Sequence, residues 1–267
     1  MAGKWLLHHY RAPMGGPRLL VLFHYAGGAA SAFRDWPTHV GARAETMAVQ
    51  LPGRESRRGE TPLEDLAAVT SPLVTAIAEA ARGRPVLLFG HSMGAALAHH
   101  IAREGVERRA FTLAALAVSA RRAPHVPPYE RDLRTLDDAG VLNELRVFGE
   151  LPADVLAEPH LADALVQRTR ADFCIAQGCR WPVPPVVRQR LAVPVLALGG
   201  VDDPTVMAAH LKSWQAFTRG PFRLQMLPGH HFFIRDPLNV KRAVDALFAH
   251  AASLTGEALA SVSNPTL

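Results

Sequence analysis

The chain contains few of the residues that build disulfide frameworks or metal centres. Its 267 residues include two cysteines, Cys174 and Cys179, which lie close together in an expected helix. Two neighbouring cysteines do not make the set of bridges that holds a small secreted domain together. The sequence also lacks a C-x-x-C pair and the clustered histidines that bind structural zinc. We therefore expect no disulfide framework, no metal and no cofactor.

Long hydrophobic runs are also missing. No stretch approaches about 20 uninterrupted apolar residues, the length needed to span a bilayer as a helix. The first residues, MAGKWLLHHYRAP, contain neither the apolar segment nor the small-residue cleavage site of a signal peptide. Together with the two cysteines, these features predict a reduced, cytoplasmic protein that has no membrane partner.

Positive charge exceeds negative charge by a modest amount. The formal net charge is +5, much of it from arginines scattered through the sequence. We find no nucleic-acid-binding motif and no interleaving of basic and aromatic residues, so we expect no nucleic-acid partner. Most of these charges should lie on the solvated surface, although a basic field also attracts acidic partners. The hydrophobic share of 49% suits one large α/β domain, with or without an insertion.

Short apolar runs alternate with helical patterns over most of the chain. This alternation predicts a mainly parallel sheet with helices on both faces, which is an α/β fold. The expected strands are 19–23, 46–51, 86–89, 113–118, 194–198 and 222–227, and the expected helices between them are 62–82, 94–103, 208–218 and 237–252.

The segment 121–190 breaks this alternation. It has prolines near both ends and two helical patterns, 136–148 and 159–178. We interpret it as a helical lid insertion over the edge of a core formed by 1–120 and 191–255; ordinary crossover helices are the alternative. The small, polar tail 256–267 is expected to be disordered.

A serine lies between two glycines after one of the predicted strands. Residues 89–95 read FGHSMGA, so Ser92 follows an apolar run and has glycine two positions away on each side. Glycines permit the sharp strand-to-helix turn that exposes a nucleophilic hydroxyl, as in the G-x-S-x-G elbow. The alternative is a simple turn that happens to contain a serine. A serine becomes nucleophilic when a base, usually a histidine oriented by a carboxylate, removes its proton.

Candidates for that acid and base follow the last two predicted strands. Residues 199–204 read GGVDDP and residues 228–233 read PGHHFF. Groups at the carboxyl ends of parallel strands meet at one edge of the sheet, and the order Ser, Asp, His is that of α/β-hydrolases. Each segment offers two candidates: Asp202 or Asp203 as the acid, and His230 or His231 as the base.

The same chemistry requires backbone N–H groups that stabilise a developing oxyanion. The first expected donor is the residue after the nucleophile, Met93. The second should come from the loop after an early strand, here HYAGG at 24–28, and Ala26 is our candidate. The alternative for this loop is an ordinary glycine turn.

Several segments together resemble the type II thioesterases of modular polyketide and nonribosomal peptide assembly lines. They are LPGRESRRGE (51–60), GHSMGA (90–95), RADF (170–173), GGVDDP (199–204) and PGHHFF (228–233). The resemblance extends from about residue 19 to about residue 252. It implies an α/β-hydrolase fold with a helical lid, and hydrolysis of acyl groups from the phosphopantetheine thiol of carrier proteins. It also assigns Asp203 as the acid, His231 as the base and Ala26 as the second oxyanion donor.

The sequence departs from the family pattern at two places. It reads FHYAGG where the family usually reads close to FPHAGG, so His24 and Tyr25 replace a proline and a histidine. Cys179 lies where the lid of relatives is often more aromatic.

These observations predict a monomeric editing thioesterase that uses Ser92, His231 and Asp203. Its partners would be acyl or peptidyl carrier protein domains, and the only phosphopantetheine would be that of the substrate. The alternatives are a generic serine carboxylesterase or acyltransferase on small esters, and a non-catalytic carrier-binding protein. Matched oxygen esters and thioesters would distinguish the first alternative, and a fluorophosphonate that leaves Ser92 unreacted would favour the second.

Overall fold

The computed structural model describes residues 2–8, 14–129, 131–149 and 157–253. The predicted disordered tail 256–267 lies outside these residues. The described residues form a seven-stranded sheet in the order β1-β3-β2-β4-β5-β6-β7, in which only the β1–β3 pair is antiparallel. The strands are β1 (Leu6–His8), β2 (Leu19–Phe23), β3 (Glu45–Val49), β4 (Val86–His91), β5 (Leu113–Ser119), β6 (Val195–Gly200) and β7 (Phe222–Leu227).

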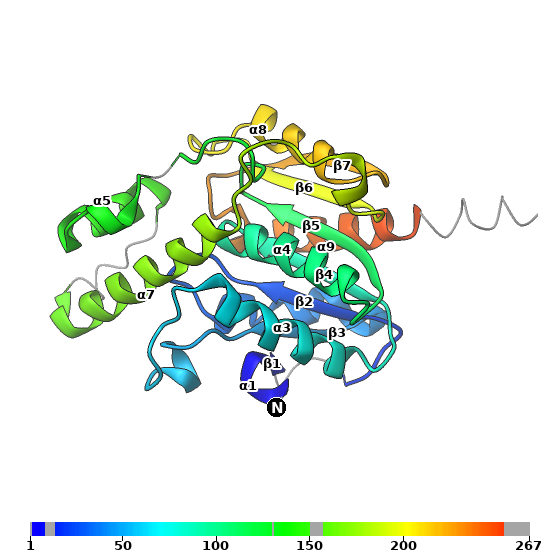
Figure 1. Cartoon of the computed structure of the whole chain (residues 1–267), viewed down its shortest axis with the longest axis horizontal. Helices are drawn as coiled ribbons and strands as arrows, with labels where there is room; N and C mark the ends of the chain where they lie inside the picture. The colour runs from blue at the N-terminus through cyan, green and yellow to red at the C-terminus, as the bar shows by residue number, and fades with distance from the viewer. Residues whose placement is uncertain (1, 9–13, 130, 150–156, 254–267) are drawn as a thin grey trace, which may run out of the picture.

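The central strands are buried on both faces because helices cover the sheet from both sides (Figure 1). Every residue of β2 and β4 is buried, which explains their continuous apolar sequences. Helices α3 (Leu66–Ala81), α4 (Met93–Glu107) and α8 (Ala208–Lys212) pack on one face, and α2 (Trp36–Val40) and α9 (Pro237–Ala251) pack on the other. The predicted α/β class with a mainly parallel sheet is confirmed.

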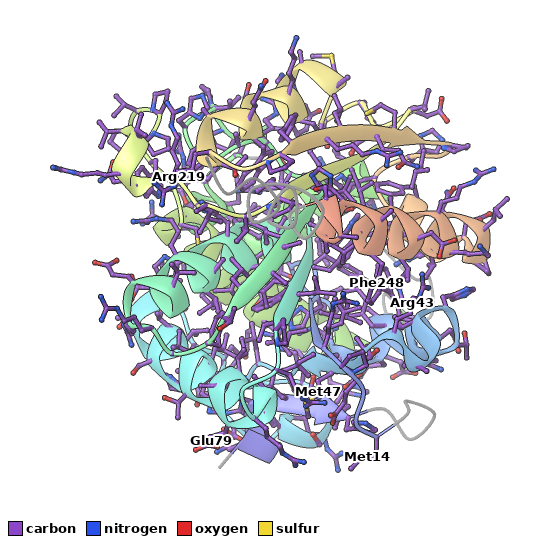
Figure 2. All side chains as sticks on the ribbon, turned by 90° about the vertical axis from the view of Figure 1, so that its right-hand side faces the viewer. Met14, Arg43, Met47, Glu79, Arg219 and Phe248 are labelled. Atoms are coloured by element: carbon purple, nitrogen blue, oxygen red, sulfur yellow. The ribbon has the colours of Figure 1, made fainter. Side chains whose placement is uncertain are left out.

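Alternate residues of each strand supply the two cores, since successive side chains of a strand point to opposite faces. Val21 belongs to the core under α3 and α4, and Leu22 belongs to the core under α2 and α9. At the end of the sheet seen in Figure 2, the guanidinium of Arg43 lies 4.7 Å from the ring centre of Phe248 and fastens the segment after α2 to α9.

Two further helices lie toward one end of the sheet (Figure 1), and the longer of the two also packs against α3 and α4. They are α5 (Asp138–Phe148) and α7 (Pro159–Gly178), and both fall within the predicted insertion 121–190. The Asp137 carboxylate caps the start of α5 by accepting a hydrogen bond from Gly140 N–H, and Gly149 ends the helix with a left-handed conformation. The division into core and lid stays a prediction.

The sequence analysis missed or misjudged some elements. The short helix α1 (Ala2–Trp5) and strand β1 were not predicted, because three or four residues show no periodicity. The predicted helix 208–218 is α-helical only as far as Lys212 and continues as a 3₁₀ helix, Ser213–Phe217. The tighter winding brings residues three apart onto one side, and it buries both Trp214 and Phe217.

Candidate active site

Ser92 occupies a strained turn between β4 and α4. Its φ and ψ angles are 54° and −120°, a conformation that side-chain-bearing residues rarely adopt. The flanking glycines are required by space: a Cβ on Gly90 would overlap the backbone of Gly94, and a Cβ on Gly94 would overlap the carbonyl groups of Phe23 and His24. The elbow therefore also packs directly against the end of β2.

His231 lies between Ser92 and Asp203. Its Nε2 is 3.1 Å from the Ser92 hydroxyl oxygen, and its Nδ1 is 2.7 Å from Asp203 Oδ2. A carboxylate can only accept, so Nδ1 carries the proton and Nε2 is free to accept one from the serine. The structure thus brings together three groups that each follow the end of a parallel strand, although Ser92 lies 139 positions before His231 in the sequence.

Asp203 is buried and is held as an anion. Burial alone would raise the pKa of its carboxyl group, but hydrogen bonds from His231 and Thr205 outweigh burial and lower the pKa to about 2. Its Oδ1 accepts from the N–H and hydroxyl of Thr205 at 2.8 and 2.7 Å and from the N–H of Val206 at 3.2 Å. The carboxylate is therefore ionised and fixed in orientation at neutral pH.

The neighbouring candidates, Asp202 and His230, lie outside this arrangement. Both are exposed. His230 Nδ1 is 2.9 Å from the carbonyl oxygen of Asp202, and the Asp202 carboxylate accepts a hydrogen bond from Gly229 N–H at 3.3 Å. These contacts stabilise the turn between the two strand ends, but they do not connect either side chain to Ser92.

Aromatic rings surround the imidazole of His231. The ring centres of Phe148, Phe232 and His91 lie 4.9, 5.1 and 5.4 Å from its own. Burial and the proximity of His231 keep the pKa of His91 well below its usual value, and its Nδ1 lies 2.9 Å from the Ser119 hydroxyl. His91 is therefore neutral and does not compete with His231 for protons.

Ala26 and Met93, the predicted oxyanion donors, line one small cavity with Ser92 and His231. Neither backbone N–H donates a hydrogen bond to any of the described residues. Both groups are therefore free to bind an oxygen of a ligand at the nucleophile.

The space beside Ser92 consists of small inner cavities, and a larger groove opens from His231 to the surface. Two cavities of about 20 Å³ adjoin Ser92 and His231, and a groove of about 720 Å³ leads from His231 to the surface. Phe148, the last residue of α5, lines all three spaces. Arg146, Arg235 and Arg242 line the outer groove and are exposed. The outer groove can therefore admit a long anionic ligand, whereas the inner cavities hold only a small group.

The described residues contain no group of three or more histidine, cysteine or acidic side chains that could hold a metal ion. Within the part of the chain that the structure describes, no helix has the length and apolar character needed to cross a bilayer. Cys174 and Cys179 are free thiols; Cys179 is buried and lines a cavity beside Ser92, and burial raises the pKa of its thiol to about 12.

Sequence reasoning did not assign a role to three residues that support the site. Thr205, two positions after Asp203, forms a local side-chain turn whose spacing was a usable signal. Arg54 and Asp172 lie within the segments 51–60 and 170–173 that carry the family resemblance, but no local pattern links them. In the structure they form a buried ion pair.

Comparison with known proteins identifies thioesterases as relatives both by sequence and by structure. A family model for the thioesterase domain matches residues 18–250. The gramicidin S biosynthesis protein GrsT of Aneurinibacillus migulanus is 33% identical over 235 residues, which cover 87% of this chain and 89% of that protein. The solved structure of RedJ, a thioesterase from the prodiginine biosynthetic pathway in Streptomyces coelicolor, is 32% identical, with a TM-score of 0.78 and coverage of 88% of this chain and 91% of RedJ. BorB, the type II thioesterase from the borrelidin biosynthetic cluster, is also 32% identical, with a TM-score of 0.78 and coverage of 93% and 98%.

Proposed function

The chain belongs to the thioesterase domain family, and on this premise we propose that it removes aberrant or stalled acyl groups from the phosphopantetheine thiol of carrier proteins. It is a hydrolase of thioesters with the α/β-hydrolase fold, and its near relatives are type II thioesterases of antibiotic and peptide biosynthesis. The proposal includes the catalytic roles of Ser92, His231 and Asp203. It also includes a carrier protein as the partner, and an enzyme that is monomeric and cytoplasmic.

One observation supports the residue assignment above all others. A single imidazole contacts a serine hydroxyl at 3.1 Å through one nitrogen and a buried carboxylate at 2.7 Å through the other. This is the geometry in which a serine is activated for acyl transfer.

In the acylation step, His231 takes the proton of Ser92 while the serine oxygen bonds to the thioester carbonyl carbon. The carbonyl oxygen becomes an oxyanion, which the N–H groups of Met93 and Ala26 stabilise. Asp203 stabilises the imidazolium that forms. The carbon–sulfur bond then breaks, and the departing sulfur receives the proton from His231.

In the deacylation step, water replaces the thiol. His231 takes a proton from the water as the water oxygen attacks the acyl carbon of the serine ester. The second tetrahedral intermediate collapses, Ser92 recovers its proton from the imidazolium, and the free acid leaves. No redox step or cofactor is needed to balance these bonds and protons.

The carrier partner is proposed from the relatives and from the shape and charge of the site. The outer groove reaches His231 from the surface and carries three exposed arginines, Arg146, Arg235 and Arg242. A phosphopantetheine arm is long and carries a phosphate, so it suits an open basic groove that narrows at the nucleophile.

The first experiment compares release of a short acid from an acylated carrier protein with release of the same acid from N-acetylcysteamine and from the matched oxygen ester. We expect faster release from the carrier, and loss of at least about 10⁴-fold in kcat for Ser92→Ala with an unchanged circular dichroism spectrum. Asp202→Asn provides a control of matched size at an exposed position. Equal or slower release from the carrier would favour a general ester or thioester hydrolase, and near-normal turnover by Ser92→Ala would overturn the serine assignment.

A further inference from the structure

Arg54 and Asp172 form an ion pair in the interior, beside the loop that carries Ala26. Arg54 follows β3, whereas Asp172 lies on α7. Guanidinium nitrogens Nη1 and Nη2 each lie 2.8 Å from a different carboxylate oxygen, and the exposed fractions of the two side chains are 1% and 0%. Burying two charges costs desolvation free energy, so a buried pair is a weak source of stability. This cost suggests a role in the function of the site.

Each member of the pair also binds the backbone of that loop. Asp172 Oδ2 accepts the N–H of Gly27 at 2.8 Å, and Arg54 Nη1 donates to the carbonyl oxygen of Gly28 at 3.0 Å. Gly27 has a φ of +73°, and a Cβ there would press on the hydroxyl of Thr169 from α7. The loop therefore lies directly against α7, and the ion pair fixes its conformation.

The direction of the Ala26 N–H depends on the carbonyl group of Tyr25, because the two groups belong to one planar peptide and point in opposite directions. The Tyr25 oxygen accepts the N–H of Gly28 at 3.0 Å and lies 2.8 Å from His24 Nδ1. Burial is the main reason that the pKa of His24 falls to about 4. The imidazole is therefore neutral at pH 7 and donates through Nδ1. Both hydrogen bonds hold the carbonyl in the loop and leave the N–H of Ala26 on the opposite side.

We propose that Arg54, Asp172 and His24 are positioning residues that hold the Ala26 N–H in the direction that stabilises the oxyanion. They act through the loop 24–28 and do not touch the substrate. The proposal rests on the proposed oxyanion role of Ala26. It also makes α7, although part of the predicted lid, a fixed support of the catalytic site.

Two variants test the proposal with small changes of shape. Asp172→Asn keeps an acceptor for Gly27 but removes the charge that pairs with Arg54, and His24→Phe keeps a ring but removes the donor to Tyr25. We expect kcat to fall about 10- to 100-fold with KM within about twofold of wild type, since complete loss of one oxyanion donor costs about 10²–10³ in kcat. The assay uses an acyl p-nitrophenyl ester and an acyl N-acetylcysteamine thioester.

The affinity for a boronic acid provides a second measurement. A purely structural defect would not change this affinity in proportion to kcat/KM. It forms a tetrahedral adduct with the serine, and one of its oxygens occupies the oxyanion position. The Kd of the boronic acid should therefore rise by the same factor as kcat/KM falls. The matched control is Arg170→Gln, which removes contacts from α7 to Asp138 and to the carbonyl oxygen of Leu133 but none to the loop.

Three results would overturn the proposal. The first is a folded Asp172→Asn or His24→Phe enzyme whose kcat is near the wild-type value. The second is an effect of these variants on KM alone, and the third is an equal loss of kcat in Arg170→Gln. If Asp172→Asn does not fold, His24→Phe decides the matter alone. A wild-type enzyme that cleaves the p-nitrophenyl ester but no thioester would contradict the proposed function, while the positioning role would still be measured on the ester.

Discussion

Asp203 receives four hydrogen bonds, from the N–H and hydroxyl of Thr205, the N–H of Val206 and Nδ1 of His231. The carboxylate of its neighbour Asp202 accepts a single hydrogen bond from the described residues, from the backbone N–H of Gly229, and it is exposed. Of these two carboxylates, only Asp203 contacts His231 and can fix the tautomer of its imidazole.

The effect of each carboxylate can be tested by amide substitution. We expect Asp203→Asn to lower kcat by about 10⁴-fold, because an amide can donate to Nδ1 and so place the proton on Nε2, where it blocks proton abstraction from Ser92. Asp202→Asn should leave kcat within about twofold of wild type. Steady-state kinetics on one thioester substrate suffices for both. A comparable loss in the two variants would show that the exposed carboxylate takes part after all.

Buried neutral histidines give the protein an acid sensitivity that is independent of catalysis. Burial, helped by Arg103, lowers the pKa of His99 to about 3, compared with 6.5 in an unfolded chain. Between these values the unfolded chain binds a proton that the folded protein does not. The contribution of neutral His99 to the free energy of unfolding is therefore fully present above about pH 6.5, and it is lost progressively as the pH falls towards 3.

We expect the free energy of unfolding to fall by roughly 2 kcal/mol from pH 8 to pH 5 on account of His99 alone. His99→Phe should remove this share, because a phenyl ring can keep the edge contacts with Trp214 and Phe217 but has no proton to bind. Urea unfolding at the two pH values measures the difference. His160→Phe on the exposed start of α7 serves as the control, and an unchanged pH dependence in His99→Phe would contradict the explanation.

At the scale of elements, the two helices at the end of the sheet differ in how they are held. Helix α7 is tied to the interior by the buried Arg54–Asp172 pair and contributes Phe173 and Ala176 to the cavity walls. Helix α5 packs on α7 through Val141 and ends at Phe148, whose ring lies against the imidazole of His231. The position of α5 therefore limits the space beside Ser92 and His231.

Truncation of Phe148 should change the preference for acyl length. Phe148→Ala would join the two inner cavities to the outer groove, since this side chain lines all three. We expect the ratio of kcat/KM for an octanoyl over an acetyl thioester to rise about tenfold or more, as pocket methylenes each contribute about 1–3 kcal/mol. Val147→Ala is the matched control, because Val147 lines only the outer groove among these three spaces. The same length profile in both variants would show that Phe148 does not limit the pocket.

The sequence predicted the parts of the site that follow from local rules. Ser92 and Asp203 follow the buried strands β4 and β6, and His231 follows β7, which is only partly buried; parallel strands deliver their ends to one edge. Physics alone left each Asp and His pair undecided, because adjacent residues share the same strand end and differ only in which way the turn directs them. The family resemblance named the residue of each pair that contacts the others in the structure.

Other features depend on packing that no local pattern reveals. The contact between Arg54 and Asp172 joins residues 118 positions apart, and it exists because α7 returns to the end of β3. The edge strand β1 is too short to show a period. The break of the predicted helix after Lys212 arises because Trp214 and Phe217 are both drawn into the core. These are tertiary effects, which override local propensity.

At the scale of the whole molecule, exposed arginines lie at both ends of the sheet. The net charge of +5 alone would attract any acidic protein. Arg146 and Arg242, however, are exposed on the groove that leads to the nucleophile, and neither makes an ion pair with another described residue. Arg219 is exposed on the side that faces the viewer in Figure 2, at the opposite end from α5 and α7.

These positions allow local recognition of a carrier to be separated from general attraction. Arg146→Glu and Arg242→Glu should each lower kcat/KM for an acylated carrier protein about tenfold at low salt, and far less for the same acyl group on N-acetylcysteamine. The loss should shrink as ionic strength rises, because at about 0.1 M salt charges more than about 10 Å apart are largely screened. Arg219→Glu changes the net charge by the same amount and should have little effect on either substrate. An equal loss in Arg219→Glu would show that net charge, and not the arginine groove, brings the carrier to the enzyme.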